Sequence, residues 1–327
     1  MSVGRRRGAQ VIASVMACLV LAGCASGPPR SPSGGGPTGD RALAERLADQ
    51  SVDYLADTLR RAGFRVETPT VAVSSESGDE DEGTVGSRTT RNVIAQTDSG
   101  RTDEVVLSGA HLDSVAEGPG INDDGSGVAA NLEIALRLGA DAPVTNAVRF
   151  VWFGAEEEGL VGSQEYVQGL SDGQRGDIAL MLNSDMIASP NAGYFVYDGD
   201  GSDPGSTEEA AAGSGTIERL LVDRLASLGV PAQPTPFNGD SDYSPFVDAG
   251  IPTGGVFTGD APSMTPEQAS LWGGRPGVPF DVCYHQACDT TSNIDRVAYE
   301  RMLNALAYGV GAFAADLNGL PPRAERS

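Results

Sequence analysis

The sequence predicts a single α/β domain with a central mixed, largely parallel sheet covered by helices on both faces. Continuous apolar segments, typical of strands buried on both sides, alternate along the chain with segments whose apolar residues recur at helical spacing. The 327 residues are 40% hydrophobic, which is sufficient for one large core. Residues 40–318 contain neither an internal repeat nor a break in composition, so one domain is expected there.

Local patterns predict the elements in chain order. Residues 40–62 carry apolar positions at helical spacing, with Asp40 available as the N-cap. β-Rich segments follow at 64–73 and 91–97, separated by the acidic stretch 74–88, which is expected to be an exposed loop. Further strands are expected at 104–110, 146–154, 177–183, 193–197 and 251–257, and helices at 127–139, 163–170, 216–229 and 295–316.

The first 24 residues have the pattern of an export signal. Three arginines at 5–7 precede an apolar stretch at 11–22, which is too short for a comfortable membrane-spanning helix. The ending "LAGC" resembles a bacterial lipobox, which implies that Cys24 is lipidated and anchors an exported protein to the outer side of the cell membrane; an ordinary signal peptide containing a cysteine is the alternative. Residues 25–39 are expected to form a flexible Gly/Pro/Ser linker, and residues 319–327 a disordered tail.

Composition excludes several functions. A net charge of −23 argues against nucleic-acid binding, which requires a basic surface. All 22 basic residues are arginine, which excludes mechanisms that need a Schiff-base lysine or a P-loop lysine. The two histidines, His111 and His285, must therefore serve any mechanism that depends on imidazole.

Two cysteines remain after processing of the N-terminus, since Cys18 leaves with the signal and Cys24 takes the lipid. Outside the cytoplasm, Cys283 and Cys288 in "CYHQAC" are expected to form a small disulfide loop. A zinc site is the competing use of these thiols, but such a site needs more thiols than the chain has.

Chemically active side chains follow three of the predicted strands. His111 and Asp113 follow the strand at 104–110, Glu156 to Glu158 follow 146–154, and Asp185 follows 177–183. Because ligand sites in open α/β sheets gather at the carboxyl ends of the strands, these residues are expected to converge. Taken singly, the glutamate triplet and the "NDDG" of the glycine-rich stretch 120–127 are more typical of solvated turns than of a metal site.

Together with His285, this set supplies imidazoles and carboxylates without thiolates. That combination suits a catalytic zinc site, in which nitrogen and oxygen ligands leave one position open. Paired metals about 3.5–4 Å apart usually share a bridging carboxylate.

The segments "GAHLDSV", "GINDDGSG", "WFGAEEEGL", "LNSDMI" and "CYHQACDT" resemble the motif series of secreted two-zinc aminopeptidases of the streptomycete leucyl aminopeptidase type. The resemblance covers roughly residues 90–295. It implies a zinc exopeptidase fold and removal of N-terminal, Leu-like residues from peptides with a free N-terminus. It also implies two zinc ions: His111 and Asp185 bind one, Glu157 and His285 bind the other, and Asp123 bridges both.

The same resemblance implies further roles. Glu156 is the general base and acid, Tyr284 donates its hydroxyl to the oxyanion, and Asp113 orients the metal-binding imidazole. The Asp123–Asp124 peptide is expected to be cis, and Glu158 to face outward or cap the next turn. We expect a monomer.

Calcium binding stays open, because the family's calcium ligands include C-terminal aspartates where this chain offers Glu300 and Asn304. Three alternatives to the aminopeptidase also stay open. They are a one-zinc glutaminyl cyclase on the same fold, an inactive lipid-anchored binding protein, and a serine hydrolase, which the absence of a G-x-S-x-G motif disfavours.

Overall fold

The computed structural model describes residues 38–73 and 88–325. The predicted signal, the lipidated Cys24 and nearly all of the predicted linker lie outside these residues. Within the described ranges, no helix combines the length and the apolar character that a membrane crossing requires.

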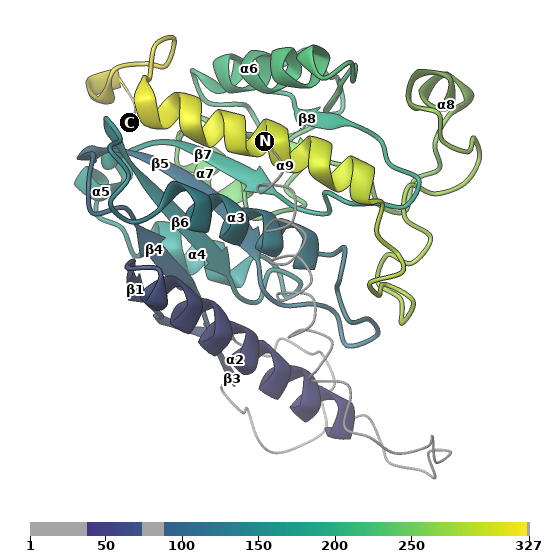
Figure 1. Cartoon of the computed structure of the whole chain (residues 1–327), viewed down its shortest axis with the longest axis horizontal. Coiled ribbons are helices and arrows are strands. Elements are labelled where there is room, and N and C mark those ends of the chain that lie inside the picture. Colours follow the sequence, from purple (N-terminus) through teal and green to yellow (C-terminus); the bar gives the residue numbers. More distant parts are fainter. Residues whose placement is uncertain (1–37, 74–87, 326–327) are drawn as a thin grey trace, which may run out of the picture.

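An eight-stranded mixed sheet forms the centre of the molecule (Figure 1). Its four middle strands run parallel to one another. The strand next to them on each side runs antiparallel to them. In spatial order the strands are β1 (Arg65–Glu67), β4 (Val93–Gln96), β6 (Asn146–Phe153), β5 (Arg101–His111), β7 (Ile178–Ser184), β10 (Thr253–Phe257), β8 (Phe195–Tyr197) and β9 (Gln233–Thr235). A separate ribbon pairs β2 (Thr70–Val73) with β3 (Arg88–Arg91). The predicted fold class is confirmed.

Helices cover both faces of this sheet. One face packs against α2 (Thr38–Arg61), α3 (Gly125–Leu138), α6 (Ser214–Ser227) and α9 (Arg296–Ala315) in the larger hydrophobic cluster. Figure 1 shows α9, in yellow, and α3 crossing in front of the strands. The opposite face packs against α4 (Val161–Gln168) and α7 (Ser244–Asp248) in a second cluster.

Alternation along the strands explains the two clusters. Successive side chains of a strand point to opposite faces, so Val106 contacts the larger cluster and Leu107 the smaller one. Both side chains are fully buried, as expected for central parallel strands covered on two sides.

The structure also corrects several sequence predictions. Helix α2 begins at Thr38, so Asp40 lies inside the helix and is not its N-cap. Five short elements were not predicted: β9, α5 (Asp172–Asp177), α7, α8 (Pro266–Trp272) and the 3-10 helix η1 (Arg323–Glu325). Residues 319–325, expected as a disordered tail, instead pack on the domain. Leu320 contacts the larger core cluster, and the carbonyl of Gly319 accepts a hydrogen bond from Thr216 Oγ1 (2.8 Å).

Candidate metal centre

Three adjacent parallel strands end at the same edge of the sheet and deliver the predicted side chains there. His111 is the last residue of β5 and lies opposite Phe153, the last residue of β6. Asp185 follows the end of β7 directly, and β7 pairs with β5 on its other side. This convergence follows from the parallel register of the strands.

The glycine-rich loop before α3 adds Asp123 to this edge. The Asp123–Asp124 peptide is cis, as expected. The carboxylate of Asp124 caps α3 by accepting the N–H of Gly127 (2.9 Å), and it also accepts the N–H groups of His111 (3.2 Å) and Met186 (3.1 Å). Asp124 thereby joins the end of β5, the start of α3 and the segment after β7.

Two groups of three potential metal ligands share one carboxylate. Nε2 of His111 lies 3.1 Å from Asp123 Oδ1 and 3.6 Å from Asp185 Oδ1. Nε2 of His285 lies 3.1 Å from Asp123 Oδ2 and 3.0 Å from Glu157 Oε2. In each group, one ligand atom per residue can be chosen so that all lie within 4.8 Å of one another. Asp123 thus offers one oxygen to each side.

The donor atoms fit zinc. His111 Nε2, Asp185 Oδ1 and Glu157 Oε1 are buried and have no hydrogen-bond partner within the described part of the chain, which is costly unless a cation satisfies them. Nitrogen and oxygen ligands, three per position, match catalytic zinc sites that keep one position open.

The three adjacent glutamates have three different surroundings. The carboxylate of Asp113 fixes the backbone of the first two, accepting the N–H groups of Glu156 (2.9 Å) and Glu157 (3.2 Å). Glu157 then faces His285, whereas Glu158 forms an ion pair with Arg88 of β3. Glu156 belongs to neither ligand group.

Asp113 contacts His111 differently from what the sequence suggested. Its backbone carbonyl lies 3.2 Å from His111 Nδ1, while its carboxylate is 3.8 Å away and is occupied by the two backbone N–H groups. The carboxylate therefore orients the glutamate segment, and the carbonyl faces the imidazole.

Burial and crowding perturb the titration of this cluster. Burial, with Asp185 and Asp242 nearby, raises the pKa of Glu156 to about 10. Burial and the charge of Asp123 raise the pKa of Glu157 to about 7. Burial lowers the pKa of His111, but the neighbouring carboxylates outweigh it and raise that pKa well above its ordinary value. Crowded carboxylates of this kind favour cations.

The segment that carries His285 is closed by a disulfide. Cys283 and Cys288 are joined with an S–S distance of 2.08 Å. The ring of Tyr284 stacks on the imidazole of His285, with centroids 3.8 Å apart. Burial raises the pKa of Tyr284 above its ordinary value, so its hydroxyl stays protonated.

Sequence reasoning missed two residues beside the site. Ser241 Oγ donates to Asp185 Oδ2 (2.7 Å), which leaves Oδ1 of that carboxylate directed at His111. The carboxylate of Asp242 is buried without a hydrogen-bond partner among the described residues, and burial raises its pKa to about 7. Both residues precede the short helix α7, whose five residues are too few for a periodic signal.

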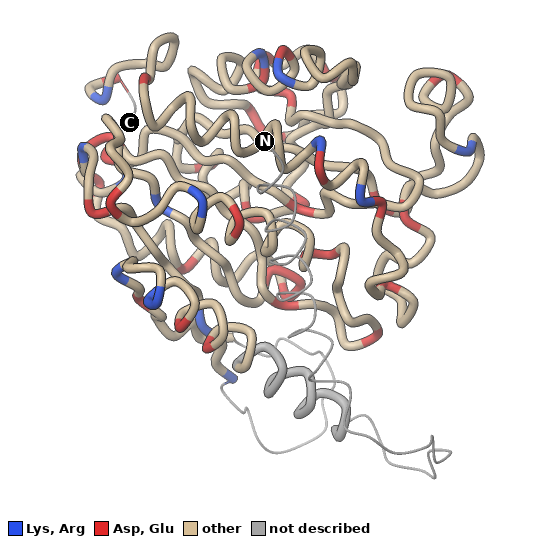
Figure 2. Tube along the Cα trace, viewed as in Figure 1, with Lys and Arg blue, Asp and Glu red and all other residues tan. Residues whose placement is uncertain are grey.

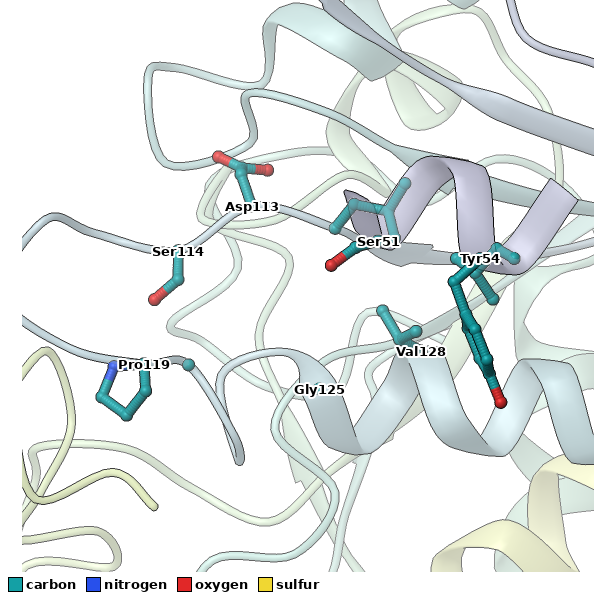
Figure 3. A pocket seen from close by; sticks show the side chains of 10 residues that line it. Ser51, Tyr54, Asp113, Ser114, Pro119, Gly125 and Val128 are labelled. Carbon is teal, nitrogen blue, oxygen red and sulfur yellow. The ribbon is translucent and has the colours of Figure 1, made fainter. Parts of the chain in front are cut away.

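A small cavity beside the site is not a substrate pocket. It is lined by Ser51 and Tyr54 of α2 and by Asp113 and Ser114 of the loop after β5 (Figure 3). Its volume of about 40 Å³ holds a few waters at most.

A third acidic group, and one residue considered for calcium binding, also have hydrogen-bond partners. Asp198, Asp200 and Glu218 lie close together, but Asp198 accepts the N–H groups of Ser202 (2.9 Å) and Asp203 (3.0 Å), and Glu218 accepts that of Gly199 (3.0 Å). Asn304, weighed above as a calcium ligand, accepts a hydrogen bond from Arg224 (2.9 Å). Acidic and basic positions are both spread over the described chain (Figure 2).

The carboxyl edge of this mixed α/β sheet thus carries two candidate ligand groups that share one carboxylate, an arrangement suited to metal binding. The chain belongs to peptidase family M28, whose model matches residues 92–310.

Curated relatives and solved structures agree with this placement. The "Probable lipoprotein aminopeptidase LpqL" of Mycobacterium tuberculosis is 46% identical over 303 residues, which are 88% of this chain and 61% of that protein. The "Probable leucine aminopeptidase 2" of Aspergillus fumigatus is 49% identical over 239 residues, 73% of this chain and 47% of that protein. The chain thus spans about half to three fifths of the length of these relatives.

Among solved structures, the zinc aminopeptidase BSAP of Bacillus subtilis has a TM-score of 0.66 at 18% identity, covering 96% of this chain and 97% of that one. A glutaminyl cyclase of Porphyromonas gingivalis has a TM-score of 0.59 at 20% identity, covering 94% and 97%. Both share the fold of this chain.

Proposed function

We propose that this protein is an exported zinc aminopeptidase that removes apolar, Leu-like residues from the N-termini of peptides. One observation carries the proposal: the two carboxylate oxygens of Asp123 face different imidazoles, Oδ1 towards His111 and Oδ2 towards His285, each at 3.1 Å. A carboxylate shared in this way suits two metals and not one. His111 and Asp185 would hold the first zinc, Glu157 and His285 the second, with Asp123 bridging.

Acidic side chains near the ligand groups support the assignment of an exopeptidase, which must bind the free α-ammonium group of its substrate. Asp242 and Asp260 lie near the ligand groups, and the charges of neighbouring carboxylates add to burial in raising the pKa of each. A peptide's free α-ammonium is a cation of the right charge for such a pocket, whereas an internal peptide bond brings no charge. A substrate with N-terminal Asp or Glu meets repulsion instead.

Glu156 is the proposed general base and acid. Its backbone is fixed by Asp113, and it belongs to neither ligand group, so its carboxylate would be available to accept the proton of the attacking water. The same carboxyl then gives the proton to the nitrogen of the leaving amine. Glu157 and Glu156 therefore divide binding and proton transfer between adjacent residues.

Tyr284 is the proposed donor to the scissile carbonyl oxygen as negative charge develops on it. The stacking of Tyr284 on His285 restricts its ring, and a protonated hydroxyl is what this role requires. Zinc bound at the two positions supplies Lewis acidity, which polarises the carbonyl and lowers the pKa of a coordinated water.

A lipid anchor at Cys24 is part of the proposal. It rests on the "LAGC" sequence after an apolar stretch and on the name of the mycobacterial relative, which is called a lipoprotein aminopeptidase. Peptides outside the cytoplasm are then the substrates, and the enzyme acts as a monomer.

A substrate panel tests the proposal. The protein is stripped of metal, reloaded with zinc, and assayed on the p-nitroanilides of Leu, Ala and Glu and on a peptide with N-terminal glutamine. We expect release of Leu with two zinc ions per chain and little release of Glu. Cyclisation of glutamine with one zinc would favour the cyclase, and zinc content near zero would favour the inactive binding protein.

A further inference from the structure

Asn122, the residue before the proposed bridging Asp123, is fully buried and bonded to two separate segments. Its N–H donates to the carboxylate of Asp289 (2.9 Å), and its Nδ2 donates to Asp281 Oδ2 (2.7 Å) and to Ser189 Oγ (3.1 Å). Its Oδ1 accepts the N–H of Ala188 (3.1 Å). Every polar group of the side chain therefore has a partner.

Each of these partners lies on a segment that carries a proposed metal ligand. Asp281 and Asp289 flank the disulfide loop with His285, and Ala188 and Ser189 follow Asp185 closely in the chain. The disulfide closes the loop on itself but does not attach it to the rest of the site. Asn122 contributes to that attachment through Asp281 and Asp289.

A second amide strengthens the same junction. Asn293 Nδ2 lies within hydrogen-bond distance of both oxygens of Asp281 (2.9 Å each) and of Asp289 Oδ1 (3.2 Å). Asp289 Oδ2 also accepts the N–H of Asp123 itself (3.2 Å). Asp281 and Asp289 are each 2% exposed and form no ion pair among the described residues. Their carboxylates therefore rely on hydrogen bonds from amide N–H groups, including the backbone N–H of Cys283 to Asp281.

We propose that Asn122 is a positioning residue that holds the ligands of the two metal positions in register through Asp281 and Asp289. This inference rests on the proposed function, since it assigns Asn122 to the metal site of that enzyme. Metal ligands tolerate displacements of only about 0.5 Å, and partners that orient them typically change metal affinity or activity 10–100-fold.

An exchange of side chains tests the role directly. Asn122→Asp keeps the shape of the side chain but places an oxygen 2.7 Å from Asp281 Oδ2, where the two carboxylates repel at about pH 8. Asn122→Asp/Asp281→Asn restores a donor–acceptor pair with the roles reversed, while Oδ1 of the new asparagine can still accept the N–H of Cys283.

The readout is zinc binding, measured by titrating the metal-free proteins with Zn²⁺ in competition with a chromophoric chelator. Because Asp123 serves both positions, we expect Asn122→Asp to weaken both zinc affinities about 10–100-fold and the double exchange to recover most of the loss. The kcat at saturating zinc should follow the same pattern.

Asn146→Asp is the matched control. Asn146 is a buried amide at the start of β6, at the other end of the strand from the site, where its Nδ2 donates to the carbonyl of Phe313 (2.8 Å). The Asn146→Asp substitution should lower the melting temperature without changing the affinity for zinc. If Asn122→Asp also lowers only the melting temperature, Asn122 is a structural residue and the proposal is wrong.

Asn293→Ala carries the test if Asn122→Asp does not fold. It removes only the outer amide of the junction, so we expect about tenfold weaker zinc binding at the His285 position, and unchanged binding would overturn the proposal. Zinc affinities of the variants are compared with the wild type irrespective of activity. A wild type that binds two zinc ions but releases no amino acid would therefore refute the proposed function and leave this test valid.

Discussion

Glu156→Gln removes a carboxylate from the centre while keeping its size and its backbone contacts. The N–H of residue 156 donates to Asp113 Oδ1 over 2.9 Å regardless of the side chain, so the amide is held where the carboxylate was. Glu156 belongs to neither ligand group, and both zinc positions therefore keep all their ligands. The substitution separates proton transfer from metal binding.

The expected loss lies in kcat. A positioned general base contributes roughly 10²–10⁴-fold, which corresponds to about 3–5 kcal/mol of activation free energy. Stability should hardly change, because burial raises the pKa of Glu156 to about 10. In the metal-free protein this carboxyl is therefore protonated at neutral pH, and glutamine is its neutral isostere. The melting temperature of the metal-free variant should stay within about 2 °C of the wild type.

Zinc content by mass spectrometry and steady-state kinetics on Leu-p-nitroanilide provide the measurement. Glu158→Gln is the matched control, since it makes the same chemical change two residues further along. A Glu156→Gln protein that retains two zinc ions but has wild-type kcat would refute the assignment of the base. One that loses a zinc ion would show that the roles of Glu156 and Glu157 are reversed.

Four further predictions concern other parts of the protein. Glu157→Ala should lose the zinc ion held with His285, and excess zinc should partly restore activity, as measured by metal content and kcat. Glu158→Ala should reduce the free energy of unfolding by less than about 1 kcal/mol, because its ion pair with Arg88 is partly exposed; chemical denaturation measures this. The metal-free protein should lose stability as pH rises from about 4.5 to about 7, a trend that zinc should suppress in thermal melts across that range. The reason is that the carboxyl of Glu157 has a pKa of about 7 in the folded protein, above its ordinary value, so the folded state loses a favourable proton as the pH rises through this range. The pKa of His285 is also raised in the folded protein, which makes stability fall with rising pH in the same way. Cys24→Ala should abolish fatty-acid labelling and release the protein into the medium, and unchanged labelling would contradict the anchor.

The long strands and the residues that follow them were predictable from the sequence. Strands β5, β6 and β7 are long enough for continuous apolar runs to identify them. The rule that ligands gather at the carboxyl ends of parallel strands then brings His111, Glu157 and Asp185 together. Their specific division into two groups came from the resemblance to a family and not from the pattern.

The residues that hold the ligands were not predictable in the same way. Asn122 precedes two aspartates in a glycine-rich loop, where an asparagine is typical of a turn. Its partners, Asp281 and Asp289, are about 160 residues away, and no local pattern relates positions at that separation. The prediction of short elements failed for a related reason. The three residues of β9 and the five of α7 are too few to show the periodicity by which a strand or a helix is identified.

The long separation between ligands has a consequence for folding. The shared carboxylate at residue 123 connects imidazoles at residues 111 and 285, which come together only after β5, β6 and β7 have paired and the chain beyond β10 has returned to the same edge. Contacts so distant in sequence form late, after most of the loop-closure entropy has been lost. The free energy of zinc binding should therefore stabilise the whole domain as one cooperative unit. A chain truncated before residue 285 would lack the imidazole of one ligand group and should lose the zinc stabilisation that depends on it.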